Sequence, residues 1–188
     1  QEKEIMSLKE MEVAFSVEGI QKGGARFDYE KAKWLNQQYL QKMGGDQLVA
    51  TFPKAFEQLK KKYGAITKEI VELIHERLVL LADIEEQTKC FLYPPEAYDE
   101  KSLKKITKGN VEEVLKIAMN GVEEHFDDIK TFFFEEGKNK NVGLGQLMQV
   151  LRLACVGSLS GPDLLPMMKI IGQDVTFERL DRLIKYIN

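Results

Sequence analysis

Two arginines stand in sequence that is otherwise apolar, and both could recognise a polar ligand. Arg77 falls within a segment that is predicted to be helical from Thr67 onward. At 100 degrees per residue, the following residues of that segment form one apolar stripe around it: Ile70, Leu73, Ile74, Leu81 and Ile84. Arg152 is the only charged residue between Leu147 and Val156. A guanidinium presents five donors in a planar fork, so each arginine could stack on an unpaired nucleobase or bond its edge.

An internal carboxylate is the alternative partner for each arginine, because guanidinium groups among apolar residues are ordinarily paired or snorkel toward water. Arg152 is distinguished by the segment on its C-terminal side. That segment, Gly157-Ser158-Leu159-Ser160-Gly161-Pro162, consists largely of small residues and predicts a turn with exposed backbone donors and acceptors. A charged fork beside such a turn suits splayed single-stranded bases.

The sequence offers no catalytic constellation. His75 and His125 lack the HExxH spacing of metal hydrolases, and none of the serines stands in a GxSxG or SxxK setting. Cys90 and Cys155 have no CxxC or Cys/His spacing that would suit zinc, so we expect buried free thiols in a reducing compartment. We therefore expect no catalytic residue, no metal and no cofactor in this chain.

The overall charge excludes a broad basic surface. The chain has 188 residues, with 27 Lys plus Arg against 30 Asp plus Glu, and a net charge of -3. A nucleic-acid site must then be a local patch, and four lysines are candidate phosphate contacts: Lys101, Lys104, Lys105 and Lys108. No apolar run approaches the roughly 18 residues of a membrane span, so we expect a cytoplasmic protein. The start at Gln1 indicates a chain cut from something longer.

Helical periodicity predicts an all-α fold. Ser7 with Glu10 is a capping box, Asp28 begins a helix that ends at Gly44-Gly45, and Asn110 with Glu113 caps another helix. The proline pair after Tyr93 predicts the main internal boundary. We expect a loop over 139–145, and we expect Pro162 to occupy a first helical position. The remaining helices are predicted over 47–63 with a break near Pro53, 67 to about 91, 126–136, 147–156, 163–171 and 176–187.

Several segments together resemble the C-terminal anticodon-binding half of bacterial glutamyl-tRNA synthetases, which are class I aminoacyl-tRNA synthetases. The resemblance covers essentially the whole chain. The segments that carry it, in the same order and spacing, are Phe27-Asp28-Tyr29-Glu30-Lys31, Trp34-Leu35-Asn36, Tyr39, Val142-Gly143-Leu144-Gly145-Gln146, Leu151-Arg152, Gly157-Ser158-Leu159, Pro162, Ile170-Ile171-Gly172 and Glu178-Arg179-Leu180.

The resemblance implies a helical cage of two anticodon-binding subdomains, 44–95 and 96–188, preceded by a stem-contact-region remnant, 1–43. It also implies roles for three residues. Arg77 would read the third anticodon base, Arg152 would contact the anticodon from the second subdomain, and Leu164 would pack against an anticodon base. Gly161 stands where relatives can carry a hydroxyl donor.

The implied partner is tRNA(Glu), with no DNA, no membrane and a monomeric chain. The full enzyme would join glutamate to that tRNA with ATP and magnesium, whereas this fragment lacks the HIGH-like and KMSKS-like signatures and should be inactive alone. The sequence is compatible with a parent enzyme that also charges tRNA(Gln). Two alternatives are the anticodon domain of a class I lysyl-tRNA synthetase and a helical protein-interaction scaffold, in which the arginines form internal salt bridges and Phe132-Phe133-Phe134 meets a partner.

Overall fold

The computed structural model describes residues 4–20, 23–24 and 26–187, and every regular element within them is a helix. The all-α prediction is confirmed. No helix in these ranges is long and apolar enough to cross a membrane. The elements are α1 (Leu8–Ala14), α2 (Tyr29–Lys42), α3 (Gly45–Thr51), α4 (Glu57–Tyr63), the 3-10 turn η1 (Gly64–Ile66), α5 (Thr67–Ile74), the 3-10 turn η2 (His75–Arg77), α6 (Asp83–Leu92), α7 (Glu100–Ile106), α8 (Val111–Glu124), α9 (Ile129–Lys140), α10 (Leu144–Val156), α11 (Leu164–Ile171) and α12 (Gln173–Ile187).

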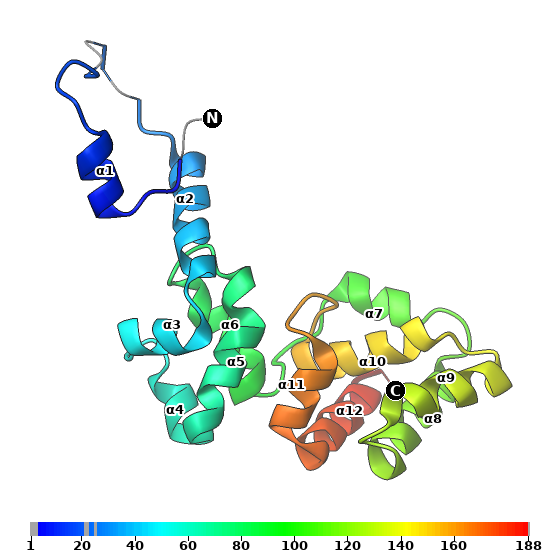
Figure 1. Ribbon diagram of the computed structural model, residues 1–188. Helices are drawn as coiled ribbons and strands as arrows, with labels where there is room; N and C mark the ends of the chain where they lie inside the picture. The colour runs from blue at the N-terminus through cyan, green and yellow to red at the C-terminus, as the bar shows by residue number, and fades with distance from the viewer. Residues whose placement is uncertain (1–3, 21–22, 25, 188) are drawn as a thin grey trace.

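The helices fall into three groups along the chain (Figure 1). α1 lies beside the far end of α2, and none of its residues is buried. Its predicted capping box is present: Ser7 Oγ accepts from the Glu10 amide at 3.3 Å, and Glu10 Oε2 accepts from the Ser7 amide at 2.8 Å. Helices α3 to α6 form the second group and α7 to α12 the third.

The predicted unbroken helix from residue 67 to about 91 is wrong. α5 ends at Ile74, a 3-10 turn follows, and Leu78 is extended before α6 begins at Asp83. The Asp83 carboxylate, in the first turn of α6, accepts from the preceding amides of Val79 at 2.9 Å and Leu80 at 2.8 Å, which fixes the chain that leads into the new helix. Because of this break, Leu81 leaves the predicted stripe and is 41% exposed.

Side chains of α2 stabilise that break. Asn36 Nδ2 donates to the carbonyl of Val79, and Gln41 Nε2 donates to the carbonyl of Glu76 at 2.9 Å. Both carbonyls belong to the stretch where the regular helical ladder stops. α2 therefore satisfies backbone groups that an unbroken helix would have bonded internally.

α10 lies at the centre of the third group and contacts α7, α8, α9, α11 and α12. It begins at Leu144, and α9 extends to Lys140, so the predicted loop over 139–145 is shorter than expected. Its sequence is apolar on nearly every side, and the following residues are buried: Leu147, Val150, Leu151, Leu153, Ala154 and Cys155. A helix surrounded by neighbours needs such a sequence.

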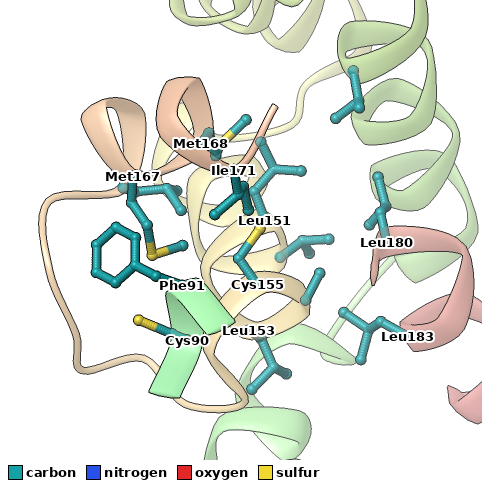
Figure 2. Close-up of a cluster of buried hydrophobic side chains, with 14 of the residues drawn as sticks. Cys90, Phe91, Leu151, Leu153, Cys155, Met167, Met168, Ile171, Leu180 and Leu183 are labelled. Atoms are coloured by element: carbon teal, nitrogen blue, oxygen red, sulfur yellow. The ribbon is translucent and has the colours of Figure 1, made fainter. Parts of the chain in front are cut away.

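The apolar core continues across the Pro94-Pro95 boundary. Phe91 at the end of α6 packs with Leu151 of α10 and Met167 of α11 (Figure 2). α11 contacts both α5 and α6. Arg77 and Arg152 are thus mounted on elements that share one core.

Candidate nucleic-acid interface

Arg77 and Arg152 converge on the turn of residues 157–162. Arg77, the last residue of η2, donates from Nη2 to Ser160 Oγ at 3.0 Å. Arg152, on α10, donates from Nη1 to the carbonyl of Pro162 at 2.7 Å. The two arginines come from opposite sides of the proline boundary, and the structure brings them to one turn.

The turn is held by its own hydroxyl and by a glycine. Ser158 Oγ donates to the carbonyl of Ser160 at 2.8 Å, and the Ser160 amide donates back to Ser158 Oγ at 3.3 Å. Gly157 ends α10 in the left-handed conformation, with φ of 86°, and a Cβ there would lie 2.8 Å from the carbonyl oxygen of Ala97. Gly157 is therefore required by both its conformation and its close packing.

Gly161 is also closely packed. A Cβ at this position would meet Val156 Cγ1 at 3.0 Å and would lie 3.6 Å from Nη1 of Arg152. Hydroxyl groups are supplied to this turn by Ser158 and Ser160.

Pro162 does not occupy a first helical position as predicted. α11 begins at Leu164 with Asp163 in the cap position, so Pro162 belongs to the turn and offers its carbonyl to Arg152. Leu164 is 2% exposed and packs into the core beneath the turn. Leu164 therefore follows directly after the turn that both arginines bond, but its side chain is kept away from solvent.

Arg77 is exposed, and its hydrogen-bond partners are neutral. Besides Ser160, its Nε donates to Gln87 Oε1 of α6 at 3.1 Å. Nη1 has no hydrogen bond to any residue that the structure describes. Part of the guanidinium fork is thus free to meet a ligand without displacing an ion pair.

A cavity of about 470 Å³, lined by Arg77, lies between α6 and the turn. One wall comes from α6 and the segment after it, including Gln87, Tyr93 and Pro94, and the other comes from Ser158, Ser160 and neighbouring turn residues. This volume lies within the range of small-ligand sites and can hold a nucleobase. Tyr93 is 51% exposed and could offer a stacking face.

The charges around the cavity are mixed. Lys89 and Glu96 form an ion pair of 3.4 Å between Nζ and Oε1, and Glu86 also lines the wall. Burial lowers the pKa of Arg152, Asp163 raises it, and the neighbouring charge of Arg77 lowers it. Two guanidinium groups within electrostatic reach of one another favour an acceptor-rich or anionic ligand.

The candidate phosphate contacts lie on a helix attached to the turn. Lys101, Lys104 and Lys105 belong to α7, Lys108 follows it, and all four are exposed. The Asp99 amide, at the cap of α7, donates to the carbonyl of Gly157 at 2.8 Å. The lysines thus extend from the turn along an adjoining surface, where they could contact successive phosphates of an RNA backbone.

The two thiols are free and buried, and burial raises the pKa of Cys90 to about 11 and that of Cys155 to about 12. Neither is therefore suited to nucleophilic chemistry near neutral pH. Among the described residues, no group of three or more His, Cys, Asp or Glu side chains could hold a metal.

The phenylalanine run does not form one exposed surface. Phe133 is fully buried, Phe132 stacks on His125 with ring centroids 4.1 Å apart, and Phe134 is 62% exposed. This arrangement gives little support to the scaffold alternative, which placed all three residues at a partner interface.

Sequence reasoning missed two partners of Arg77. Ser160 is 83 positions away, and Gln87 would lie well along the axis from Arg77 in the unbroken helix that was predicted. Sequence reasoning also missed Arg179, which is 3% exposed in α12 and bonds the carbonyls of Cys90 and Cys155. A signal for Arg179 was present in the Pro94-Pro95 pair, because prolines deprive preceding helical carbonyls of donors.

The chain is similar in sequence to members of a known family. Residues 29–184 match the sequence model of the anticodon binding domain family. The chain is 33% identical over 189 residues to the glutamate–tRNA ligase of Christiangramia forsetii, and 34% identical over 189 residues to that of Flavobacterium johnsoniae. Each alignment covers 97% of this chain and 37% of the relative, so the chain spans well under half of the relatives' length.

A solved structure extends the similarity to three dimensions. The crystal structure of a glutamate tRNA ligase from Elizabethkingia meningosepticum in complex with its amino acid superposes with a TM-score of 0.86 at 33% identity. The superposition covers 99% of this chain and 38% of that one.

Proposed function

The chain belongs to the anticodon-binding domain family, and we propose that it binds the anticodon loop of tRNA(Glu) as part of a glutamate–tRNA ligase. Its similarity to ligases of this specificity over nearly its whole length supports the choice of tRNA. The class I lysyl-tRNA synthetase alternative has no comparable support from these relatives.

One observation carries the proposal: Arg77 and Arg152 reach the same turn from separate helical elements, and both bond neutral acceptors there. Arg77 lines a cavity large enough for a base, and Arg152 bonds the carbonyl of Pro162 in the turn that forms one wall of that cavity. Such a constellation can bind an unstacked base by its edge and its face.

Within this proposal, Arg77 reads the third anticodon base and Arg152 contacts the anticodon from the α10 side. A contact of Leu164 with a base would require the 157–162 turn to move, because the Leu164 side chain is 2% exposed. The exposed lysines of and after α7 contact phosphates: Lys101, Lys104, Lys105 and Lys108. Residues 44–95 and 96–188 act as the two anticodon-binding subdomains, and 1–43 as the stem-contact remnant.

The whole protein would join glutamate to tRNA(Glu) with ATP and magnesium, using a catalytic domain outside this chain. The chain alone, which we expect to be a monomer, should not activate glutamate. Glutamate-dependent pyrophosphate exchange by the purified chain should stay at background. Exchange above background would contradict the assignment of catalysis to a separate domain.

Binding of an RNA hairpin with the tRNA(Glu) anticodon stem and loop tests the proposal directly. Affinity should fall steeply with salt, because phosphate contacts release counterions. A hairpin with the same stem and an unrelated loop is the matched control and should bind more weakly. Equal affinity for both loops, or binding that salt does not change, would contradict anticodon recognition and favour a protein scaffold.

A further inference from the structure

Two carbonyls at the end of α6 lack the donors that a continuing helix would supply. In a helix, the carbonyl of residue 90 accepts from the amide of residue 94, and that of 91 from 95. Pro94 and Pro95 have no N–H to give. The carbonyls of Cys90 and Phe91 are therefore left to side chains from elsewhere in the fold.

Arg179 of α12 bonds one of these carbonyls together with the end of another helix. Its Nη1 donates to the carbonyl of Cys90 at 2.6 Å and to the carbonyl of Cys155 at 2.8 Å. Cys155 lies in the last turn of α10. One buried nitrogen thus joins the C-terminal ends of α6 and α10, where carbonyl dipoles favour a cation.

The other freed carbonyl is bonded from within the second helical group. Phe91 O accepts from Tyr63 Oη at 2.6 Å and from Lys62 Nζ at 3.0 Å. Lys62 and Tyr63 are close to each other in sequence and lie on α4. Of these three side chains, Arg179 is therefore the one that connects the end of α6 to α10 and α12.

The two helix ends joined by Arg179 lead directly into the two walls of the cavity. The segment after α6 supplies Tyr93, Pro94 and Pro95, and the segment after α10 supplies the 157–162 turn. Both bonded residues precede these walls by only a few positions. The spacing of the helix ends consequently fixes how far Arg77 and Gln87 stand from the turn.

Resting on the proposed function, we propose that Arg179 is a positioning residue for RNA recognition, which sets the separation between the two walls of the anticodon-binding cavity. It does not touch the RNA. Its Nε is buried and has no hydrogen-bond partner among the residues that the structure describes, so the guanidinium is held there by the two bonds of Nη1. The two carbonyl bonds give this buried charge a geometric role.

The test compares Arg179→Met and Arg179→Lys with the original chain. Methionine retains much of the apolar stem and removes both donors, whereas the lysine ammonium can restore at least one of them. We expect Arg179→Met to bind the tRNA(Glu) anticodon hairpin roughly tenfold more weakly, with reduced preference over the altered-loop hairpin, because small displacements of a binding group are costly. Arg179→Lys should recover part of both losses.

Thiol labelling supplies a second readout. Because global unfolding also exposes a buried thiol, each labelling rate is compared with the rate expected from that variant's free energy of unfolding, and only labelling in excess of it reports local widening. Cys155 is fully buried, and widening between α6 and α10 should raise its reaction rate with a disulfide reagent in native buffer. Circular dichroism establishes that each variant is folded at the assay temperature. Arg182→Met is the control, because Arg182 is exposed on the same helix, and it should change neither labelling nor binding.

The outcomes separate this inference from the proposed function. If the original chain does not distinguish the two hairpins, the proposed function itself fails. If it does, and folded Arg179→Met binds and discriminates as the original chain does, Arg179 has no positioning role. Should Arg179→Met not fold, Arg179→Gln takes its place in both assays. A folded Arg179→Gln that loses thermal stability, yet binds as the original chain does and labels no faster than its free energy of unfolding predicts, overturns the inference.

Discussion

Arg77 and Ser160 are 83 positions apart in the chain, and Nη2 of the arginine donates a 3.0 Å hydrogen bond to Oγ of the serine. This bond joins η2 to the turn after α10 across one wall of the cavity. Because Gln87 bonds Nε at the same time, the guanidinium plane is fixed before any ligand arrives. A preorganised fork loses less conformational entropy on binding than a free side chain would.

Arg77→Lys should relax the choice of the third anticodon base. Lysine retains the charge but not the planar fork, so we expect a loss of about 1 to 3 kcal/mol for the matching hairpin and a smaller loss for hairpins altered at that base. Dissociation constants for hairpins that differ only at this position measure the effect. Equal weakening of all hairpins, or of none, would make Arg77 a structural residue.

Ser160→Ala is the matched control for that experiment. It removes a partner of Arg77 within the protein and leaves the fork intact. We expect the base preference to persist in this variant, since the reading group is still present.

Lys104→Gln should weaken all hairpins alike. A phosphate contact carries no sequence information, so the base preference stays constant while the slope of log affinity against log salt falls by about 1. Lys138→Gln serves as the control, because Lys138 is exposed on α9, a different helix from α7. An effect of Lys104→Gln on one hairpin alone would show that this lysine reads a base.

Local sequence signals were sufficient to predict many helix ends. The Asp28 cap accepts from the Lys31 amide at 3.0 Å, the Asn110 cap accepts from the Glu113 amide at 3.4 Å, and α6 ends before the proline pair. Each of these signals acts within a few residues, so it can be recognised without knowing the fold. The helix predicted over 147–156 likewise ends where α10 ends, at Val156.

The break between α5 and α6 could not be predicted in the same way. Its carbonyls are bonded by Asn36 and Gln41, more than thirty residues earlier in the chain, and apolar periodicity continues through the segment. The candidate site likewise has features that the sequence predicted and others that only the fold explains. The two arginines were conspicuous in the sequence, but their meeting at the 157–162 turn depends on the packing of α11 against α5 and α6.

Gly121→Ala should destabilise the third helical group. A Cβ at this position of α8 would lie 2.3 Å from Cε1 of Phe133, a fully buried ring on α9. Overpacking of this kind costs about 1 to 3 kcal/mol of unfolding free energy, which urea denaturation can measure. Unchanged stability would mean that the ring moves freely into other space.

Gly145→Ala is the opposite case and provides the comparison. Gly145 lies in the first turn of α10, and a Cβ there would meet nothing within 4 Å. Alanine should stabilise the helix by up to about 1 kcal/mol, since glycine loses more backbone entropy on folding. The two glycine variants should therefore move the unfolding midpoint in opposite directions.

The buried thiol of Cys155 should make the chain less stable in alkali. Burial raises its pKa from 9.0 to about 12, so between these values the unfolded state has released a proton that the folded state still holds. Stability is then fully present below pH 9 and is lost as pH rises toward 12, by up to about 1.4 kcal/mol for each pH unit.

Cys155→Ala removes this proton from both states, and its unfolding free energy should fall less steeply over the alkaline range. The comparison uses slopes, because the smaller side chain also leaves a cavity that lowers stability equally at every pH. Cys90, Tyr63 and Tyr98, whose pKa values burial also raises, are present in both proteins, so their contributions cancel apart from the smaller effect that the charge of Cys155 has on the pKa of Tyr98. If the unfolding free energies of the two proteins, measured by urea denaturation, instead fall with parallel slopes against pH, the pKa of Cys155 is not raised by folding. That result would contradict the burial of Cys155 between α10 and its neighbours.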